Sequence, residues 1–109
     1  MLDKSFPPEQ ASGMPAESTP IKEAHRVLVR LRLDTTVVHL RLERGILIVN
    51  GRICYPDIMG EGHRDVNYEL LHEMHRQLRL INGVKAVEYQ LKNFLHTGDG
   101  GWSKRFFRL

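Results

Sequence analysis

The sequence of 109 residues is 41% hydrophobic and 27% charged, with a formal net charge of +3. This size and composition are typical of one globular domain, and no apolar run approaches the ~18 residues that a transmembrane helix requires. Cys54 is the only cysteine, so we interpret it as a small buried apolar residue rather than as a disulfide partner or reactive thiol. Residues 1–20 lack the apolar segment of a secretory signal, and we expect a cytoplasmic protein.

The first 20 residues contain four prolines among small and polar residues, with few side chains that could anchor them. Such a segment buries too little apolar surface to offset the entropy lost on ordering, which predicts disorder. We therefore divide the chain into a disordered tail at 1–20, a folded domain at 21–95 and a basic, aromatic tail at 96–109.

Residues 21–33 carry two overlapping apolar patterns. One recurs at spacings of three and four, as on one face of a helix: Ile21, Ala24, Leu28 and Leu31. The other alternates at a period of two, as in a strand: Val27, Val29, Leu31 and Leu33. Pro20 and the helix-forming residues after it favour a helix over 21–32, and a strand remains the alternative.

A β-hairpin is predicted next, with strands at 35–42 and 46–53. Its turn is Glu43-Arg44-Gly45, in which Gly45 is free to adopt a positive φ. Residues 46–49 are apolar on both faces of the second strand, which predicts a central strand covered on each side.

Residues 54–64 contain a proline and two glycines and are predicted to form a loop. A second helix follows, because apolar residues recur there every four positions: Val66, Leu70, Met74 and Leu78. Asp65 is the predicted N-cap, and Asn82-Gly83 supplies the left-handed stop.

Residues 84–91 form the last predicted strand, with Tyr89 and Leu91 available to pack in the sheet. The order of elements is therefore α-β-β-α-β. It predicts an α+β fold, a small αββαβ two-layer sandwich in which both helices cover one face of a three-stranded mixed sheet.

The glycine and apolar pattern of the hairpin and of the last strand resembles that of the BON domain, a small bacterial αββαβ module. The matching positions are Gly45, Ile46, Ile48, Gly51 and Ile53, followed by Gly83, Val84, Val87 and Leu91. The resemblance covers about 21–93. It implies a bacterial domain that associates with phospholipid membranes or partner proteins, and the family has no universal catalytic motif.

Histidine-rich and acidic positions are candidate sites of chemistry. Glu69, His72 and His75 recur every three residues on the second predicted helix, and His63 precedes it, but no HExxH motif occurs. We interpret these residues as a solvated or pH-sensitive helix face. No carboxylate pair, P-loop or GxxG clamp is present, so we expect no enzyme and no metal or other cofactor.

The C-terminal tail interleaves aromatic and basic side chains without an acidic residue after Asp99. Rings beside cations suit an interface with protein or with the headgroups of a membrane, and the alternative is that Trp102 and Phe106 fold back on the domain. The candidate docking residues are Trp102, Lys104, Arg105, Phe106, Phe107 and Arg108.

The sequence thus suggests a non-catalytic binding module that docks to a protein partner or to an anionic phospholipid surface, at the periphery of the membrane in the latter case. A homo-oligomer is a further alternative. Nucleic-acid binding is a less favoured alternative, for which the candidate residues are Arg26, Arg30, Arg32, Arg41, Arg44 and Arg52. A metal-binding domain comes third.

Overall fold

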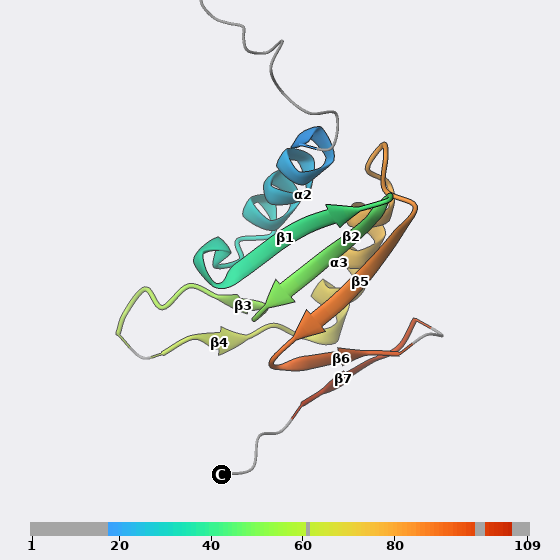
Figure 1. Ribbon diagram of the computed structural model, residues 1–109. Coiled ribbons are helices and arrows are strands. Elements are labelled where there is room, and N and C mark those ends of the chain that lie inside the picture. The colour runs from blue at the N-terminus through green and yellow to red at the C-terminus, as the bar shows by residue number, and fades with distance from the viewer. Residues whose placement is uncertain (1–17, 61, 98–99, 106–109) are drawn as a thin grey trace, which may run out of the picture.

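The structure is a computed structural model that describes residues 18–60, 62–97 and 100–105. Two helices and a sheet of three strands form its main body (Figure 1). The helices are α2 (Ser18–Arg30) and α3 (Tyr68–Arg79), and the strands are β1 (Val38–Glu43), β2 (Ile46–Gly51) and β5 (Ala86–Leu91). Two small hairpins complete the fold, β3 (Cys54–Tyr55) with β4 (Arg64–Asp65) and β6 (Phe94–His96) with β7 (Trp102–Lys104).

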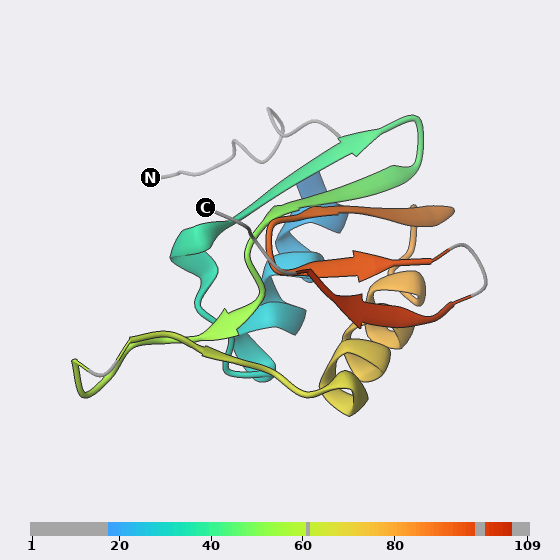
Figure 2. The ribbon, with the colours of Figure 1, turned by 90° about the horizontal axis from the view of Figure 1, so that it is seen from below.

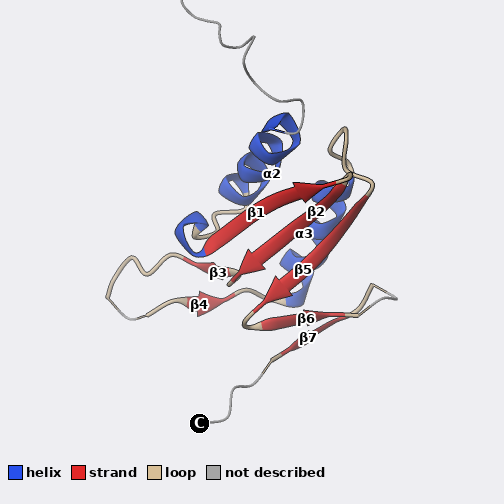
Figure 3. Ribbon diagram, in the orientation of Figure 1, coloured by secondary structure: helices blue, strands red, loops and turns tan. Residues whose placement is uncertain are grey.

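The three-stranded sheet has the order β1-β2-β5 and is mixed, because β1 runs antiparallel to β2 whereas β5 runs parallel to it. Both helices lie on the same face of this sheet, as two views at right angles show (Figures 1 and 2). The expected α+β fold is confirmed: two layers, helices on one face and a mixed three-stranded sheet (Figure 3).

The core lies between the sheet and the two helices. Leu47 and Val49 of β2 are fully buried on the helix-covered face, where Leu71, Met74 and Leu78 of α3 meet them. The predicted stripe of the second helix is therefore the buried face of α3. Residues at odd positions of β2 lie under the helices, and those at even positions, such as Ile46 with 38% exposure, lie on the other face. β2 is the central strand, as predicted, and Ile48 on the other face is also buried, with 5% exposure. Neither described helix covers that face, so the predicted cover on both sides is confirmed only in part.

Two glycines of the central hairpin have different structural roles. The turn of the hairpin is the pair Arg44 and Gly45, with φ of 54° and 84°, as in the type I′ turn that matches the twist of paired strands. Gly51 ends β2 at φ 114°, and a Cβ there would lie only 2.1 Å from the carbonyl oxygen of Val37. Gly51 therefore permits a close backbone approach that no other residue allows.

Several predicted boundaries differ from the structure. Helix α2 begins at Ser18, inside the segment expected to be disordered, and ends at Arg30. Residues 1–17 of that segment lie outside the described part of the chain. The first strand begins at Val38 because Thr35–Val37 form a 3₁₀ turn, in which the Asp34 side chain accepts a hydrogen bond from the Thr36 amide and competes with extended backbone.

The second helix is capped by Asn67, whose side chain accepts a hydrogen bond of 2.8 Å from the Leu70 amide, and not by Asp65. Asp65 lies in β4 and pairs with Cys54 of β3, so the ends of the predicted 54–64 loop form a short hairpin. The predicted C-terminal tail is also structured in part, since β7 pairs with β6, which lies beside β5 (Figure 2).

Candidate functional site

Strand β1 is an edge of the main sheet, and its outward-facing backbone is the first component of the site. The pair Glu43 and Ile46 flanks the two-residue turn, so odd-numbered residues of β1 exchange hydrogen bonds with β2. The hydrogen bond of 2.9 Å from the Arg52 amide to the Val37 oxygen continues the same alternation. The amide and carbonyl groups of Leu40 and Leu42 therefore point away from the sheet.

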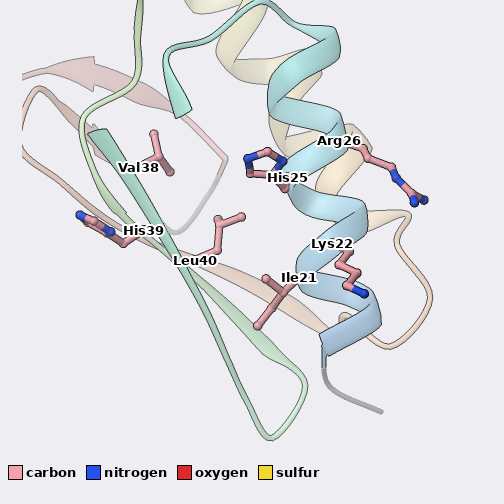
Figure 4. A pocket seen from close by; sticks show the side chains of 7 residues that line it. All are labelled: Ile21, Lys22, His25, Arg26, Val38, His39 and Leu40. Carbon is pink, nitrogen blue, oxygen red and sulfur yellow. The ribbon is translucent and has the colours of Figure 1, made fainter. Parts of the chain in front are cut away.

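A groove of about 510 Å³ lies between this edge and helix α2 (Figure 4). Its floor is apolar, with Ile21 from the helix and Val38 and Leu40 from the strand, and Figure 4 shows these three side chains converging between the two elements. His25 projects from α2 into the same space. Leu40 is half buried, and the apolar floor is continuous with the core.

The polar side chains around the groove are all basic. Lys22, His25 and Arg26 come from α2 and His39 from β1, and no carboxylate of the described residues lines the groove. Lys22 and Arg26 extend along the outer side of the helix, where Arg26 also forms an ion pair with Glu23 (Figure 4). All four side chains are exposed, and two of them, Lys22 and Arg26, are cations, so the groove presents to solvent an apolar floor beside a cationic rim.

The opposite edge of the sheet is closed by a cluster of rings. Trp102 of β7 lies with its ring centroid 4.7 Å from Tyr89 of β5 and 4.6 Å from His96 of β6. His75 of α3 joins them, with Nδ1 2.8 Å from the Tyr89 hydroxyl. Burial lowers the pKa of His75, helped by the charges of His96, Arg79 and His72, and burial also raises the pKa of the Tyr89 hydroxyl.

The predicted docking residues of the tail are only partly described. Trp102 is half buried in the ring cluster, in keeping with the alternative in which it folds back on the domain. The Lys104 ammonium lies 3.0 Å from Asp65, and the Arg105 amide donates a hydrogen bond of 2.9 Å to the Asn93 oxygen. Phe106, Phe107 and Arg108 lie outside the described residues.

Asp65 and Asn93 fasten this C-terminal hairpin to the body of the fold. The buried Asn93 side chain donates to the Ile53 oxygen at 2.8 Å and to Asp65 at 3.0 Å, and it accepts from the Ile53 amide at 3.2 Å. Burial acts to raise the pKa of Asp65, but hydrogen bonds from Lys104 and Asn93 and the charges of Lys104 and Arg52 hold it below its usual value.

The six arginines considered for nucleic-acid binding do not share one surface. Arg26 and Arg30 lie on α2, Arg41 lies on the helix-free face of β1, and Arg44 lies in the hairpin turn. Arg26, Arg41 and Arg52 each pair with a carboxylate, from Glu23, Glu43 and Asp65 respectively. The charge available to a phosphate backbone is therefore divided and partly neutralised.

The histidines considered on the second predicted helix also separate. His72 and Glu69 are exposed on α3, whereas His75 is half buried against Tyr89. His63 belongs to another cluster, near the 3₁₀ turn η1 (Thr35–Val37).

The groove was missed by sequence reasoning. The alternation of Val38, Leu40 and Leu42 with polar residues is typical of a strand with one exposed face, but it does not say which strand lies at an edge. The position of α2 beside β1 depends on tertiary packing, which this alternation does not encode.

Comparison with known proteins provides no template for this site: the sequence matches no family model, and neither a curated protein nor a solved structure is significantly similar to it. Among the described residues, neither helix combines the length and apolar character that crossing a bilayer demands.

Proposed function

We propose that the protein is a non-catalytic binding module that captures an extended, acidic peptide segment of a partner protein along β1. The observation that carries this proposal is the outward-facing backbone of β1 beside the apolar, cation-rimmed groove under α2. A peptide added as a further strand pairs its backbone with Leu40 and Leu42, and its alternate side chains enter the groove. Apolar side chains meet Ile21 and Val38, and carboxylates meet the basic rim.

The geometry supports this function better than the tail-docking hypothesis. Trp102 and Lys104 already have partners within the domain, in Tyr89 and Asp65. In contrast, the β1 edge has no paired strand among the described residues. Exposed strand edges are templates for pairing, and proteins that use them for recognition combine backbone hydrogen bonds with side-chain pockets.

The test is selection from a displayed library of random 12-residue peptides with the full chain as bait, followed by fluorescence titration of the enriched peptides. We expect sequences in which acidic and apolar residues alternate, and binding that weakens as salt increases. Peptides without acidic residues, or the same affinity at low and high salt, would contradict the cationic rim as the basis of recognition.

Two substitutions at one position separate backbone pairing from side-chain packing. Leu40→Pro removes an amide that points away from the sheet and leaves the ladder with β2 intact. Leu40→Ala removes a similar amount of apolar surface and keeps that amide. We expect Leu40→Pro to weaken peptide binding at least about tenfold more than Leu40→Ala. Equal losses in two folded variants would show that the peptide does not add to β1.

Charge reversal tests the rim. Lys22→Glu combined with Arg26→Glu should weaken binding roughly tenfold, mainly through slower association. Lys92→Glu reverses an exposed cation after β5, at the far edge of the sheet, and should leave binding unchanged. Circular dichroism and thermal melting confirm that the variants are folded.

Two further measurements test for other occupants of the groove. Flotation of the full chain with vesicles containing phosphatidylserine would favour the phospholipid surface if the enriched peptides fail to compete. Sedimentation equilibrium would favour a second copy on β1 if the wild type is a dimer and Leu40→Pro is a monomer. Either outcome would overturn the peptide as the occupant of the groove.

A further inference from the structure

A second cluster of reactive side chains lies where α2 leads into β1, and it shares no residue with the groove. Asp34 precedes the 3₁₀ turn η1 (Thr35–Val37), Cys54 begins β3, and His63 lies just before β4. A carboxylate oxygen, a sulfur and a ring nitrogen from these three residues all lie within 4.8 Å of one another.

The local fold brings these three segments together through the backbone. The Asp34 amide donates a hydrogen bond of 2.9 Å to the carbonyl oxygen of Cys54, which joins the start of η1 to β3. The pairing of Tyr55 with Arg64 returns the chain, so that His63 lies beside the same point. The cluster is therefore built from backbone pairing and not from three chance side-chain positions.

The Asp34 carboxylate is held in a defined orientation. Its Oδ1 accepts hydrogen bonds from the Thr36 amide at 3.0 Å and from the Thr36 hydroxyl at 2.6 Å. Its Oδ2 is thereby directed to His63, whose Nε2 lies 2.8 Å away. Such outer contacts orient the ligands in protein metal sites and are a regular part of them.

We propose that Asp34, Cys54 and His63 bind a single Zn²⁺ ion. Sulfur, imidazole nitrogen and carboxylate oxygen are the three donor types that proteins use for zinc, and three protein ligands leave a fourth position for water. Tetrahedral zinc with bonds of about 2.0–2.3 Å places its ligand atoms about 3.3–3.8 Å apart. The cluster reaches this geometry when the ligand atoms of His63 and Asp34 move slightly apart. The more widely separated pairs of ligand atoms must then approach each other by about 1 Å.

The chemistry of binding is an exchange of protons for the metal. Zinc replaces the hydrogen bond between His63 and Asp34, and the proton held between them leaves Nε2 for Nδ1 of the same ring or for solvent. The Cys54 thiol releases its proton to solvent as the sulfur coordinates the ion. No electron transfer is involved. The ion enters from the side of His63, whose side chain is 31% exposed, because Cys54 is fully buried.

A nucleophilic Cys-His-Asp triad is the other chemistry that these residue types suggest. A catalytic thiolate must reach its substrate, and Cys54 has no exposed surface. The geometry therefore favours a bound metal that ties η1 to the β3–β4 hairpin.

Cobalt provides the direct test, because Co²⁺ occupies zinc sites and reports its ligands by absorption. The full chain, without a histidine tag and freed of metal with a chelator, is titrated with Co²⁺ and then with Zn²⁺. We expect one equivalent of Co²⁺ to produce a thiolate-to-cobalt charge-transfer band, and Zn²⁺ to abolish it. Absence of this band in the folded wild type would overturn the proposal, leaving a hydrogen bond between His63 and Asp34 beside a buried thiol.

Variants assign the ligands. Cys54→Ser should abolish the charge-transfer band, and His63→Gln should weaken Zn²⁺ binding at least about tenfold in isothermal titration. Thr36→Val removes the hydroxyl that orients Asp34 and should weaken binding about tenfold. The matched control is His72→Gln, which removes an exposed histidine of α3 and should change nothing.

A second readout is the thermal stability of the wild-type protein. Zn²⁺ at a hundredfold excess over its dissociation constant should stabilise the folded wild type by about 2.7 kcal/mol, detected as a higher melting temperature. Zinc that leaves the melting temperature unchanged, or that binds Cys54→Ser as tightly as the wild type, would contradict the assigned site.

Discussion

The two edge strands of the main sheet, β5 and β1, differ in what lies beside them. Beyond β5, the β6–β7 hairpin places Trp102 against Tyr89, and Asn93 ties this hairpin to Ile53 and Asp65. Beyond β1, amide and carbonyl groups still face outward beside a basic groove. One edge is closed by packed side chains, and the other has no paired strand among the described residues. On the proposal that β1 binds a peptide, substitutions at the closed edge should affect folding and those at the β1 edge should affect binding.

The largest expected effect on stability comes from β2, the strand that pairs with both edge strands. Gly51→Ala places a Cβ 2.1 Å from the Val37 oxygen at a φ of 114°, which forces β1 away from β2. We expect a loss of about 4 kcal/mol or more in the free energy of unfolding, measured by urea denaturation. Gly45→Ala is the control, because the nearest atoms to its Cβ belong to the flexible Lys85 side chain, and it should cost about 1–2 kcal/mol. Equal costs would contradict the close approach at Gly51.

The next effect is at the closed edge. Trp102→Ala removes a ring that contacts Tyr89 and His96, and should lower the free energy of unfolding by about 2–3 kcal/mol. Ser103→Ala, at an exposed position of the same strand, should have an effect within about 0.5 kcal/mol. If Trp102→Ala leaves stability unchanged, the ring is not part of the folded body and the tail-docking hypothesis gains support.

Asn93 sharpens the same comparison. Asn93→Ala leaves the buried amide and carbonyl of Ile53 without the side-chain partners they have in the structure, at an expected cost of about 2 kcal/mol. Asn50→Ala removes an amide that reaches Gln90 on the exposed face, and its cost should be well below 1 kcal/mol. A similar small loss in both variants would indicate that solvent replaces Asn93 at Ile53.

The smallest effect is a pH dependence of the closed edge. Burial lowers the pKa of His75 in the folded state, so the unfolded chain binds the proton more readily. The contribution of neutral His75 to folding stability is complete above the pKa of about 6.5 that histidine has in the unfolded chain. This contribution is lost as the pH falls through the pKa of His75 in the folded state.

We therefore expect the melting temperature to fall between about pH 8 and pH 5.5, and to fall less steeply in His75→Gln. The neighbouring charges of His96, Arg79 and His72 also contribute to the lowered pKa, so the control is His25→Gln, at an exposed position of α2. The same slope in His75→Gln and the wild type would contradict the role of His75.

The main elements could be predicted because their signals are local. Alternating apolar residues, the turn at Gly45 and the stripe along α3 each depend on residues close in the chain. The β6–β7 hairpin could not be predicted in this way, since its stability comes from contacts of Trp102 and Asn93 with distant segments. The cap at Asn67 was missed because Asp65, an equally good capping type, is held by β4 and its ion pairs.

The candidate sites were harder to predict for the same reason. The groove needs α2 beside β1, and the cluster of Asp34, Cys54 and His63 needs a backbone link between residues 34 and 54. His63 was weighed as a metal ligand from the sequence, but with residues of α3 that the fold places elsewhere. Spacing along the chain reports proximity only within one element.

The parallel pairing of β2 with β5 has a consequence for synthesis on the ribosome. The β1–β2 hairpin can form as soon as Gly51 is available, within microseconds, because its pairing is local. The partner on the other side of β2 is complete only at Leu91, roughly 2–8 s of translation later. During that interval the nascent chain carries Leu47 and Val49 without their final cover, and chaperones have their main opportunity to act on it then.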